Sequence, residues 1–404
     1  MKVVQINTVA NTGSTGRIAE EIGKKAIARG WESYIAYGRG TPRSESHLIK
    51  IGSEWDMRWH GLETRLLDNH GLSSRRATRE FVKQLEKIKP DVVHLHNIHG
   101  YYLNYKILFQ YLADNDIPVV WTLHDCWSFT GHCSHFIYTK CDKWKTGCAN
   151  CAQKHGYPGA MLLSRSEKNY CDKARYFTMP RRVVITPASQ WIASLLKDSF
   201  LKNHTIHCVN NGVDLKQFAP AEDMAQLRQR MGIDPSKHLV LGVSSVWNAQ
   251  KGINDFHQLR ECLPEDYDMV LVGLPQEMID ALPQGIRGLG RTRNAYELAD
   301  WYRIADVFAN PTHADTFPTV NMEALACGTP VVTYSGTGGS AEQVDQKTGR
   351  VVAENDIKAF ADAIMEIVSL PEMRADCRKR AEALYNKDDR FNEYVDIYEE
   401  LTRK

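Results

Sequence analysis

The chain has 404 residues, of which 43% are hydrophobic and 25% charged, and this length and composition are typical of a globular protein with two domains. No apolar run reaches the ~18 residues of a membrane-spanning helix, and the amino terminus lacks the apolar core of a signal peptide, so we expect a cytoplasmic protein. The net charge of +1 conceals an asymmetry, because residues 1–205 hold 29 basic and 18 acidic side chains, whereas the remainder holds 21 basic and 31 acidic ones.

The first half alternates between short β-branched runs and helical patterns. Strands are expected at residues 3–7, 33–37, 91–96, 119–124 and 183–187. Helical periodicity is expected over residues 16–28, 75–88 and 104–114. This alternation predicts parallel βαβ units, and thus an α/β domain built as a doubly wound, Rossmann-like sheet.

A second series of the same kind begins near residue 239. Its strands are expected at residues 239–244, 269–273, 286–289, 307–310 and 330–334, with helices around 296–304 and 320–326. The turn-forming run 210–214 separates the two series. We therefore expect domains at 1–208 and 209–386, with a last amphipathic helix within 387–404 packing back on the first domain. Two such domains facing each other would bind ligands in a cleft at the carboxyl ends of both sheets.

The most informative segment is 311–332, which carries Asp315 and, eight positions later, Glu323. A helix beginning near Thr319 would present unpaired backbone N–H groups, which bind anions. Glu323, about one turn into that helix, could accept hydrogen bonds from two ribose hydroxyls. The alternative is a plain helix cap followed by acids that face solvent.

This segment resembles the carboxyl-terminal signature of retaining glycosyltransferases with the GT-B fold, specifically glycosyltransferase family four. The signature is an acid, seven residues, Glu, and then Ala-x-Ala-x-Gly-x-Pro-Val-Val. Only the first acid departs from it, since Asp315 replaces the usual Glu. The resemblance implies that Glu323 binds the nucleotide ribose. It also implies that Asp315 binds donor-sugar hydroxyls together with the backbone around the helix start, at Phe317, Pro318, Thr319 and Val320.

Two further loops resemble the family in the expected order. Lys251-Gly252 matches the loop that carries a lysine toward the donor diphosphate, but the arginine expected before it is absent; Arg291 or Arg293 could replace it. The turn containing Gly13 and Gly16 corresponds to the loop that closes over donor phosphate and acceptor. The alternatives are a solvated surface lysine and an ordinary βα turn, since the glycines lack the three-glycine dinucleotide pattern.

Histidines stand at the ends of two predicted strands. The resemblance places His124 near the transferred sugar, and a buried structural histidine is the alternative. Strand alternation puts His94 and His96 on one face, where we expect His94 to be packed in the interior. Asn97 and His99 follow that strand and could reach an acceptor.

Four cysteines cluster in one insertion, at Cys133, Cys141, Cys148 and Cys151. The last two have the two-residue spacing of zinc ligands, and disulfides are rare in the cytosol. A structural zinc site is therefore one interpretation, and free buried thiols are the other. The cysteine insertion itself resembles the members of the family that build bacterial surface polysaccharides.

The resemblance implies transfer of a hexose from a nucleotide diphosphate sugar, with uridine more common than guanosine, to a glycan acceptor in polysaccharide or O-antigen biosynthesis. No metal or other cofactor is then required for catalysis, because the lysine and the helix dipole supply the positive charge. The basic half suits a lipid-linked acceptor or peripheral contact with an anionic inner membrane, or simply attraction between domains. No nucleic-acid-binding pattern accompanies it. A nucleotide-sugar epimerase or hydrolase, and a non-catalytic binding protein, remain as alternatives.

Overall fold

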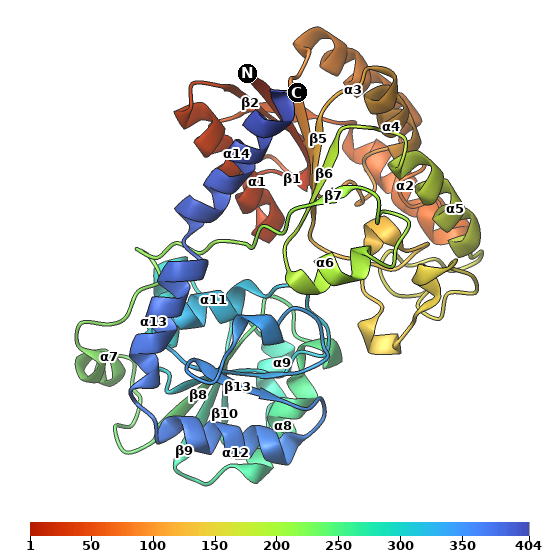
Figure 1. Cartoon of the computed structure of the whole chain (residues 1–404). Coiled ribbons are helices and arrows are strands. Elements are labelled where there is room, and N and C mark those ends of the chain that lie inside the picture. The colour runs from red at the N-terminus through yellow and green to blue at the C-terminus, as the bar shows by residue number, and fades with distance from the viewer. Residues whose placement is uncertain (404) are drawn as a thin grey trace. The chain divides into compact units, whose positions relative to one another are not determined.

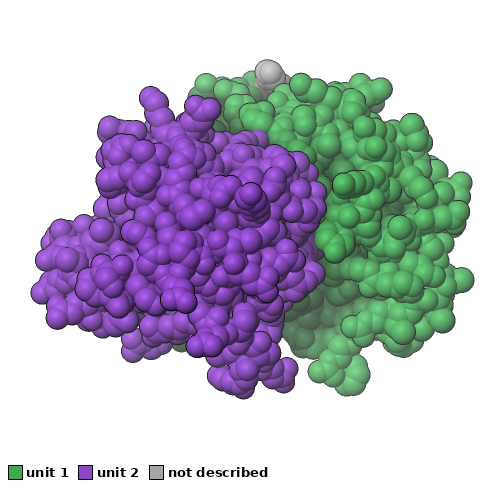
Figure 2. Space-filling model, turned by 90° about the horizontal axis from the view of Figure 1, so that it is seen from below, with its two compact units in different colours: residues 1–210, 390–404 green, residues 211–389 purple. Residues whose placement is uncertain are grey.

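A computed structural model describes residues 1–403, and the chain divides into two compact units. Unit 1 comprises Met1–Asn210 together with the residues from Arg390 onward, and unit 2 comprises Asn211–Asp389 (Figure 2). The sequence placed these two boundaries after residues 208 and 386. The chain thus enters unit 2 once and returns to unit 1 through its last helix.

Unit 1 contains a parallel sheet of seven strands in the order β3-β2-β1-β4-β5-β6-β7. The strands are β1 (Lys2–Val9), β2 (Glu32–Arg39), β3 (His47–Lys50), β4 (Val92–Leu95), β5 (Val119–Leu123), β6 (Val183–Pro187) and β7 (Thr205–Ile206). Its helices are α1 (Gly13–Ala28), α2 (Glu54–Leu67), α3 (Arg75–Ile88), α4 (Tyr105–Asp114), α5 (Ser166–Phe177), α6 (Gln190–Leu196) and most of α14 (Lys387–Thr402). Short 3-10 turns η1 (Trp127–Phe129), η2 (Ile137–Thr139) and η3 (Lys143–Lys145) lie in the cysteine-rich insertion.

Both faces of this sheet are covered, because alternate strand residues point to opposite sides. Val3, Val92 and Val120 pack with side chains of α1 and α14. Their strand neighbours, such as Val4 and Val93, pack on the other face with aromatic side chains of α3, α4 and α5. Figure 1 shows α1 and α14 on one side of the strands and α3, α4 and α5 on the other.

Unit 2 repeats the plan with six parallel strands in the order β10-β9-β8-β11-β12-β13. The strands are β8 (His238–Val243), β9 (Tyr267–Val272), β10 (Ile286–Leu289), β11 (Val307–Asn310), β12 (Val331–Tyr334) and β13 (Gly349–Val352). The helices are α7 (Met224–Arg230), α8 (Ile253–Cys262), α9 (Gln276–Asp280), α10 (Ala295–Ile304), α11 (Thr319–Ala326), α12 (Ile357–Val368) and α13 (Met373–Leu384), with 3-10 turns η4 (Ala249–Lys251) and η5 (Ala341–Gln343). One core joins the sheet to α8 and α12.

The strand orders confirm the prediction of two Rossmann-like, doubly wound α/β domains. In each unit the order reverses between the first strand and the fourth, at β1/β4 and at β8/β11. Ligands of such sheets bind beyond the carboxyl ends of the strands that flank this reversal. In unit 2 those ends lead into the loops that carry Lys251 and Asp315.

Several elements were not expected from the sequence. The short edge strands β3, β7 and β13 have two to four residues each, too few to show a period. Helix α2, 14 residues long, was also not expected; most of its apolar side chains face solvent, and its buried residues are Met57, His60 and Thr64. Throughout residues 1–403, no helix is both long enough and apolar enough to cross a bilayer.

Candidate functional site

Glu323 projects from the second turn of α11 and is held by a tyrosine of the neighbouring helix α10. The hydroxyl of Tyr302 donates a hydrogen bond of 3.0 Å to Oε2 of Glu323. Tyr302 is fully buried, and burial, followed by the Glu323 charge, raises its pKa well above the usual value, so the hydroxyl stays protonated and remains a donor. Glu323 itself is half-buried. The tyrosine therefore fixes the carboxylate at the edge of unit 2.

The loop after β11 is pinned in place by a glycine-rich loop after β12. Asp315 accepts a backbone hydrogen bond from Gly339 (3.0 Å) and donates one to the carbonyl of Thr337 (3.0 Å). Gly338 has a φ of +120°, and a Cβ there would lie 1.8 Å from the carbonyl oxygen of Asp315. Only glycine permits this approach, so the backbone of Asp315 is fixed by a second loop.

Lys251 and Asp315, predicted from different motifs, form an ion pair. The Nζ of Lys251 lies 2.5 Å from Oδ2 of Asp315, and both side chains are only partly exposed. Lys251 ends the short turn η4, where Asn248 caps its backbone N–H at 2.9 Å. The following Gly252 has a φ of +78° and packs against Pro311 so closely that a Cβ would lie 2.3 Å from the proline carbonyl oxygen. The ion pair and the Gly252–Pro311 contact thus hold the loops after β8 and β11 against each other.

The amino end of α11 lies directly beyond Asp315. Its N-cap position is Pro318, which provides no side-chain hydrogen bond, and its first turn holds no acid. Phe317 donates its N–H to Oδ1 of Asp315 (3.2 Å), while the Pro318 carbonyl accepts from Gln343 (3.1 Å). Since proline has no N–H, the backbone donors at the helix start are those of Thr319 and Val320. The partial positive charge of the helix start accompanies the Lys251 ammonium.

Of the two arginines considered as replacements for the absent one, Arg291 is better placed. Its guanidinium donates to the carbonyl of Ser245 (3.3 Å), on the loop that leads from β8 to Lys251. Arg293 instead pairs with Glu297 of its own segment at 3.2 Å. Arg291 therefore contacts the loop that carries Lys251, whereas Arg293 pairs with Glu297.

A charged network that the sequence did not suggest braces this loop. His313 Nε2 lies 3.0 Å from Asp255 and Nδ1 lies 3.0 Å from Glu354. The hydrogen bond with Asp255 raises the pKa of His313 despite its burial. Tyr334 donates to the other oxygen of Asp255 at 2.7 Å. The only sequence signal for this network was a histidine two residues before Asp315. Because Asp255 and Glu354 hold His313 from both ring nitrogens, His313 positions the loop that carries Asp315.

In unit 1, the turn after β1 has the tight geometry that its glycines predicted. Gly13 has a φ of +64°, and a Cβ on Gly16 would lie 3.1–3.3 Å from Val9, Ala10 and Asn11 atoms. Asn11 donates its backbone N–H to the Gly16 carbonyl at 3.0 Å. The structure therefore places α1 close behind β1, and whether this turn binds a ligand stays a prediction.

The histidines at the ends of β4 and β5 form a connected row. His124 Nε2 lies 3.1 Å from His96 Nδ1, and His96 Nε2 lies 3.0 Å from the Gln5 side chain. His94 is fully buried between Tyr398 and Thr122, as expected of a structural histidine. Burial lowers the pKa of His124 to about 4, so its imidazole is neutral near pH 7.

Next to this row, His99, which the sequence suggested as a contact to an acceptor, forms a pair with Asp125 that was not predicted. His99 Nε2 lies 2.8 Å from Asp125, and its Nδ1 lies 3.1 Å from the Tyr157 hydroxyl. Burial alone would raise the Asp125 pKa, but the charge and hydrogen bond of His99 outweigh it and lower the value to about 2. The pair gives the carboxyl edge of unit 1 an ionised acid, where a polar ligand could be oriented.

The four clustered cysteines come together around one small cavity, which His132 also lines. Cys148 accepts a hydrogen bond from the Gly131 N–H at 3.1 Å, and His132 Nδ1 forms a hydrogen bond of 2.7 Å with Oδ1 of Asp68. Within residues 1–403, however, no three His, Cys, Asp or Glu side chains are arranged to hold a metal ion. The cysteines are free thiols in this structure, so its side-chain positions do not support the predicted zinc site.

Comparison with known proteins matches both halves of the chain to family models. Residues 15–217 match the model described as Glycosyltransferase Family 4, and residues 226–384 match that of Glycosyl transferases group 1. WcaC of Escherichia coli (strain K12), named for glycosyl transfer in colanic acid biosynthesis, is 24% identical over 99% of this chain and 100% of its own. The D-inositol 3-phosphate glycosyltransferase of Xylanimonas cellulosilytica is 32% identical, over 49% of this chain and 52% of its own.

Solved structures share the fold at low identity. Sucrose-phosphate synthase of Thermosynechococcus elongatus superposes with a TM-score of 0.72 at 18% identity, covering 99% of this chain and 98% of its own. Anabaena HepE in complex with UDP gives a TM-score of 0.71 at 14% identity, covering 99% and 100%. Both are like this chain in fold across nearly its whole length.

Proposed function

The chain belongs to glycosyltransferase family 4, and from this premise we propose that it transfers a hexose with retention of configuration from a UDP-sugar to a glycan in surface-polysaccharide synthesis. The observation that carries the proposal is the meeting of Lys251, Asp315 and the uncapped start of α11 on loops at the carboxyl edge of unit 2. A helix start and an ammonium together suit a diphosphate. With the enzyme class shown, the epimerase, hydrolase and non-catalytic alternatives are not retained.

Each residue of this edge then has a role toward the donor. Glu323, fixed by Tyr302, accepts hydrogen bonds from the ribose hydroxyls. Lys251 and the N–H groups of Thr319 and Val320 offset the negative charge that grows on the leaving diphosphate. Asp315 holds Lys251 and its carboxylate binds a sugar hydroxyl when the donor is present.

The transfer step involves one bond formed and one broken at the anomeric carbon. The acceptor hydroxyl oxygen bonds to that carbon on the face from which the diphosphate oxygen leaves. The acceptor proton passes to the departing diphosphate, so no separate protein base is needed. The protein supplies position and charge, and Lys251 with the α11 dipole takes the place of a divalent metal.

In this proposal, the carboxyl edge of unit 1 binds the transferred sugar and the acceptor. His124 is neutral at pH 7, so one ring nitrogen donates and the other accepts, and it can hydrogen-bond a sugar hydroxyl without adding charge. The ionised Asp125, held by His99, can accept from an acceptor hydroxyl. These roles rest on chemistry and position at the strand ends.

The choice of uridine and of a surface polysaccharide is supported by what related proteins are called. Solved structures of Anabaena HepE contain UDP, and one contains UDP with glucose. WcaC is named for colanic acid biosynthesis, and LpsB of Rhizobium meliloti, 30% identical over 38% of this chain, is named a lipopolysaccharide core mannosyltransferase. A guanosine donor is therefore the competitor to be tested.

The test is to incubate the enzyme with UDP- and GDP-hexoses, with and without glycan acceptors, and to follow nucleotide release and product configuration by NMR. We expect acceptor-dependent release of UDP and a product with the anomeric configuration of the donor. Nucleotide release at the same rate with and without acceptor would indicate a hydrolase. A product with the inverted anomeric configuration would contradict the proposed mechanism. Conversion of the donor sugar without nucleotide release would indicate an epimerase.

A further inference from the structure

Helix α2 presents its larger apolar side chains to solvent and smaller or polar ones to the core. Its buried residues are Met57, His60 and Thr64. Trp55 and Trp59 are 76% and 63% exposed, and Leu62 and Leu66 continue the same stripe one and two turns later. A surface helix normally has the opposite arrangement, and exposed apolar patches mark interaction sites.

A second segment extends this stripe. Met161, Leu162 and Leu163 are exposed to 65%, 67% and 54%. Met161 donates its N–H to the Arg65 carbonyl at 2.6 Å, and Leu163 donates to the Leu66 carbonyl at 3.3 Å, so the segment runs along the end of α2. We call the combined surface the apolar face; it consists of Trp55, Trp59, Leu62, Leu66, Leu67, Met161, Leu162 and Leu163.

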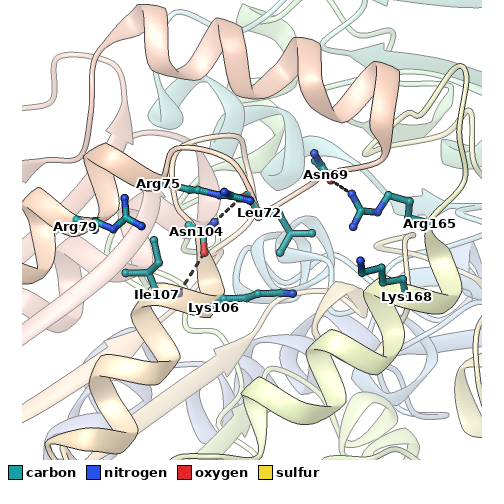
Figure 3. A pocket seen from close by; sticks show the side chains of 9 residues that line it. All are labelled: Asn69, Leu72, Arg75, Arg79, Asn104, Lys106, Ile107, Arg165 and Lys168. Atoms are coloured by element: carbon teal, nitrogen blue, oxygen red, sulfur yellow. Dashed lines mark hydrogen bonds between the residues drawn. The ribbon is translucent and has the colours of Figure 1, made fainter.

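A basic pocket begins where the apolar face ends. It is a cavity of about 320 Å³ whose lining has five cationic side chains and no carboxylate. Figure 3 shows Arg75 and Arg79 of α3 on one side, Arg165 and Lys168 on the other, and Lys106 of α4 between them. Asn69, Leu72, Asn104 and Ile107 complete the lining.

Most of this positive charge is not neutralised by the protein. Lys106 pairs with Asp172 at 2.7 Å, and Arg165 donates to the Asn69 side chain at 2.6 Å. Within residues 1–403, Arg75, Arg79 and Lys168 have no carboxylate within ion-pairing distance. Arg75 begins α3 and Lys168 lies in the first turn of α5, where a cation opposes the helix dipole. A bound anion would relieve this repulsion.

The apolar face and the basic pocket adjoin along the chain at two places. Leu66 precedes the pocket residue Asn69 by three positions, and Leu163 precedes Arg165 by two. We propose that this combined surface docks unit 1 on an anionic phospholipid bilayer, with a lipid phosphate in the basic pocket and the apolar face in the acyl boundary. Tryptophan favours that boundary, and clustered cations are attracted to anionic headgroups.

The adjoining apolar face is what selects a lipid phosphate over a soluble one. A pocket for free phosphate needs only its cations, whereas eight exposed apolar residues beside it are unfavourable in water unless something covers them. Opposite charge in the pocket and apolar surface beside it match the two layers of a bilayer leaflet. This inference is independent of which sugar the enzyme transfers.

The test is co-sedimentation of the full chain with vesicles of phosphatidylcholine alone or mixed with phosphatidylglycerol. We expect binding to the mixed vesicles that falls with added salt. The triple variant Arg75→Gln, Arg79→Gln, Lys168→Gln should lose roughly a hundredfold in binding, from about fivefold for each cation near an anionic surface. The matched control Arg181→Gln, Lys197→Gln, Lys202→Gln removes the same charge from exposed sites of unit 1 outside the pocket and should bind much as wild type.

Insertion of the apolar face is read separately with brominated acyl chains, which quench tryptophan fluorescence on contact. Quenching should be strong in the wild type and largely lost in Trp55→Ser, Trp59→Ser, whose circular dichroism spectrum should be unchanged because both side chains are exposed. Wild-type protein that binds neither vesicle type, but gains stability from inorganic pyrophosphate that the triple variant does not gain, would overturn the proposal in favour of a soluble phosphate in the basic pocket. Concentration-dependent dimers that disappear in the tryptophan variant, without vesicle binding, would overturn it in favour of self-association.

Discussion

Lys251 and Asp315 are 64 positions apart in the chain, yet the lysine Nζ lies 2.5 Å from the aspartate Oδ2. Each residue sits on a loop beyond the carboxyl end of a central strand, and backbone contacts through Gly252 and Gly338 fix both loops. The pair therefore places one positive and one negative group at the edge of unit 2 before any donor binds. The proposed catalytic roles of Lys251 and Asp315 depend on this arrangement.

Removing the Lys251 charge should slow transfer far more than it weakens folding. We expect Lys251→Ala to lower kcat by about a hundredfold or more, the usual cost of losing one group that stabilises transition-state charge. Steady-state kinetics with the best donor measures this. Lys358→Ala removes an exposed lysine of the same unit and serves as the control. An unchanged kcat in Lys251→Ala would show that the lysine does not act on the leaving group.

Asp315 should tolerate the longer acid better than the loss of its charge. Asp315→Glu keeps a carboxylate that can reach Lys251, so we expect activity within about tenfold of wild type, or 1.4 kcal/mol in the barrier. Asp315→Ala should lose much more, because Lys251 and the Phe317 N–H both lose their partner. Comparable kcat/KM values for the Ala and Glu variants would contradict this role.

Tyr302→Phe tests whether Glu323 is held in position by its tyrosine. The hydrogen bond to a charged carboxylate is worth about 1.5 kcal/mol or more, so donor KM should rise by roughly tenfold with little change in kcat. Tyr296→Phe on the same helix alters an exposed tyrosine and should behave as wild type. A fall in kcat with KM unchanged would indicate that Glu323 acts on the reaction step instead.

Stability should fall in mild acid, and His124 contributes to that fall. Burial lowers its pKa to about 4, whereas in the unfolded chain a histidine titrates near 6.5, so the folded state binds fewer protons in between. The contribution of His124 is complete above about pH 6.5 and is lost as the pH falls toward 4. Urea unfolding at several pH values should show a smaller acid loss in His124→Asn than in wild type, and equal losses would contradict it.

Catalysis should persist without divalent metal. Lys251 and the start of α11 supply the positive charge in the proposed mechanism, so turnover should survive EDTA and gain little from Mg²⁺. Metal analysis of the purified protein tests the cysteine cluster in the same experiment. One tightly bound zinc per chain would show that the cysteines rearrange from the positions seen here. Complete loss of activity in EDTA, restored by Mg²⁺, would contradict the metal-free mechanism.

The general plan of the fold was predictable because strand and helix periodicities alternate along the chain. Local sequence patterns also predicted two site elements: the amino-terminal turn with Gly13 and Gly16, and the helix that carries Glu323. Such patterns can be read from a single sequence. The apolar residues of helix α2 have helical spacing, but the sequence does not show which face is buried: this stripe faces solvent, and Met57, His60 and Thr64 lie against the core.

Contacts between distant residues were beyond a single sequence. Nothing near Lys251 identifies Asp315 as its partner, and nothing near His313 identifies Asp255 and Glu354. The four clustered cysteines do line one cavity, but their spacing in the sequence could not show whether their sulfur atoms converge on a single point. Such arrangements depend on tertiary packing.

The central claim is that unit 2 holds a nucleotide diphosphate through Glu323 and the start of α11. Thermal unfolding with UDP, GDP and their hexose derivatives tests it most directly, in wild type, Glu323→Ala and the exposed control Glu261→Ala. A ligand at one hundred times its Kd should add ~2.7 kcal/mol, or about 5–10 °C in Tm for a domain of this size. The account predicts this shift with UDP compounds in wild type and Glu261→Ala, and its loss in Glu323→Ala. The account would be contradicted if no nucleotide raised the Tm of folded wild-type protein, or if the Tm of Glu323→Ala rose by as much as that of the wild type.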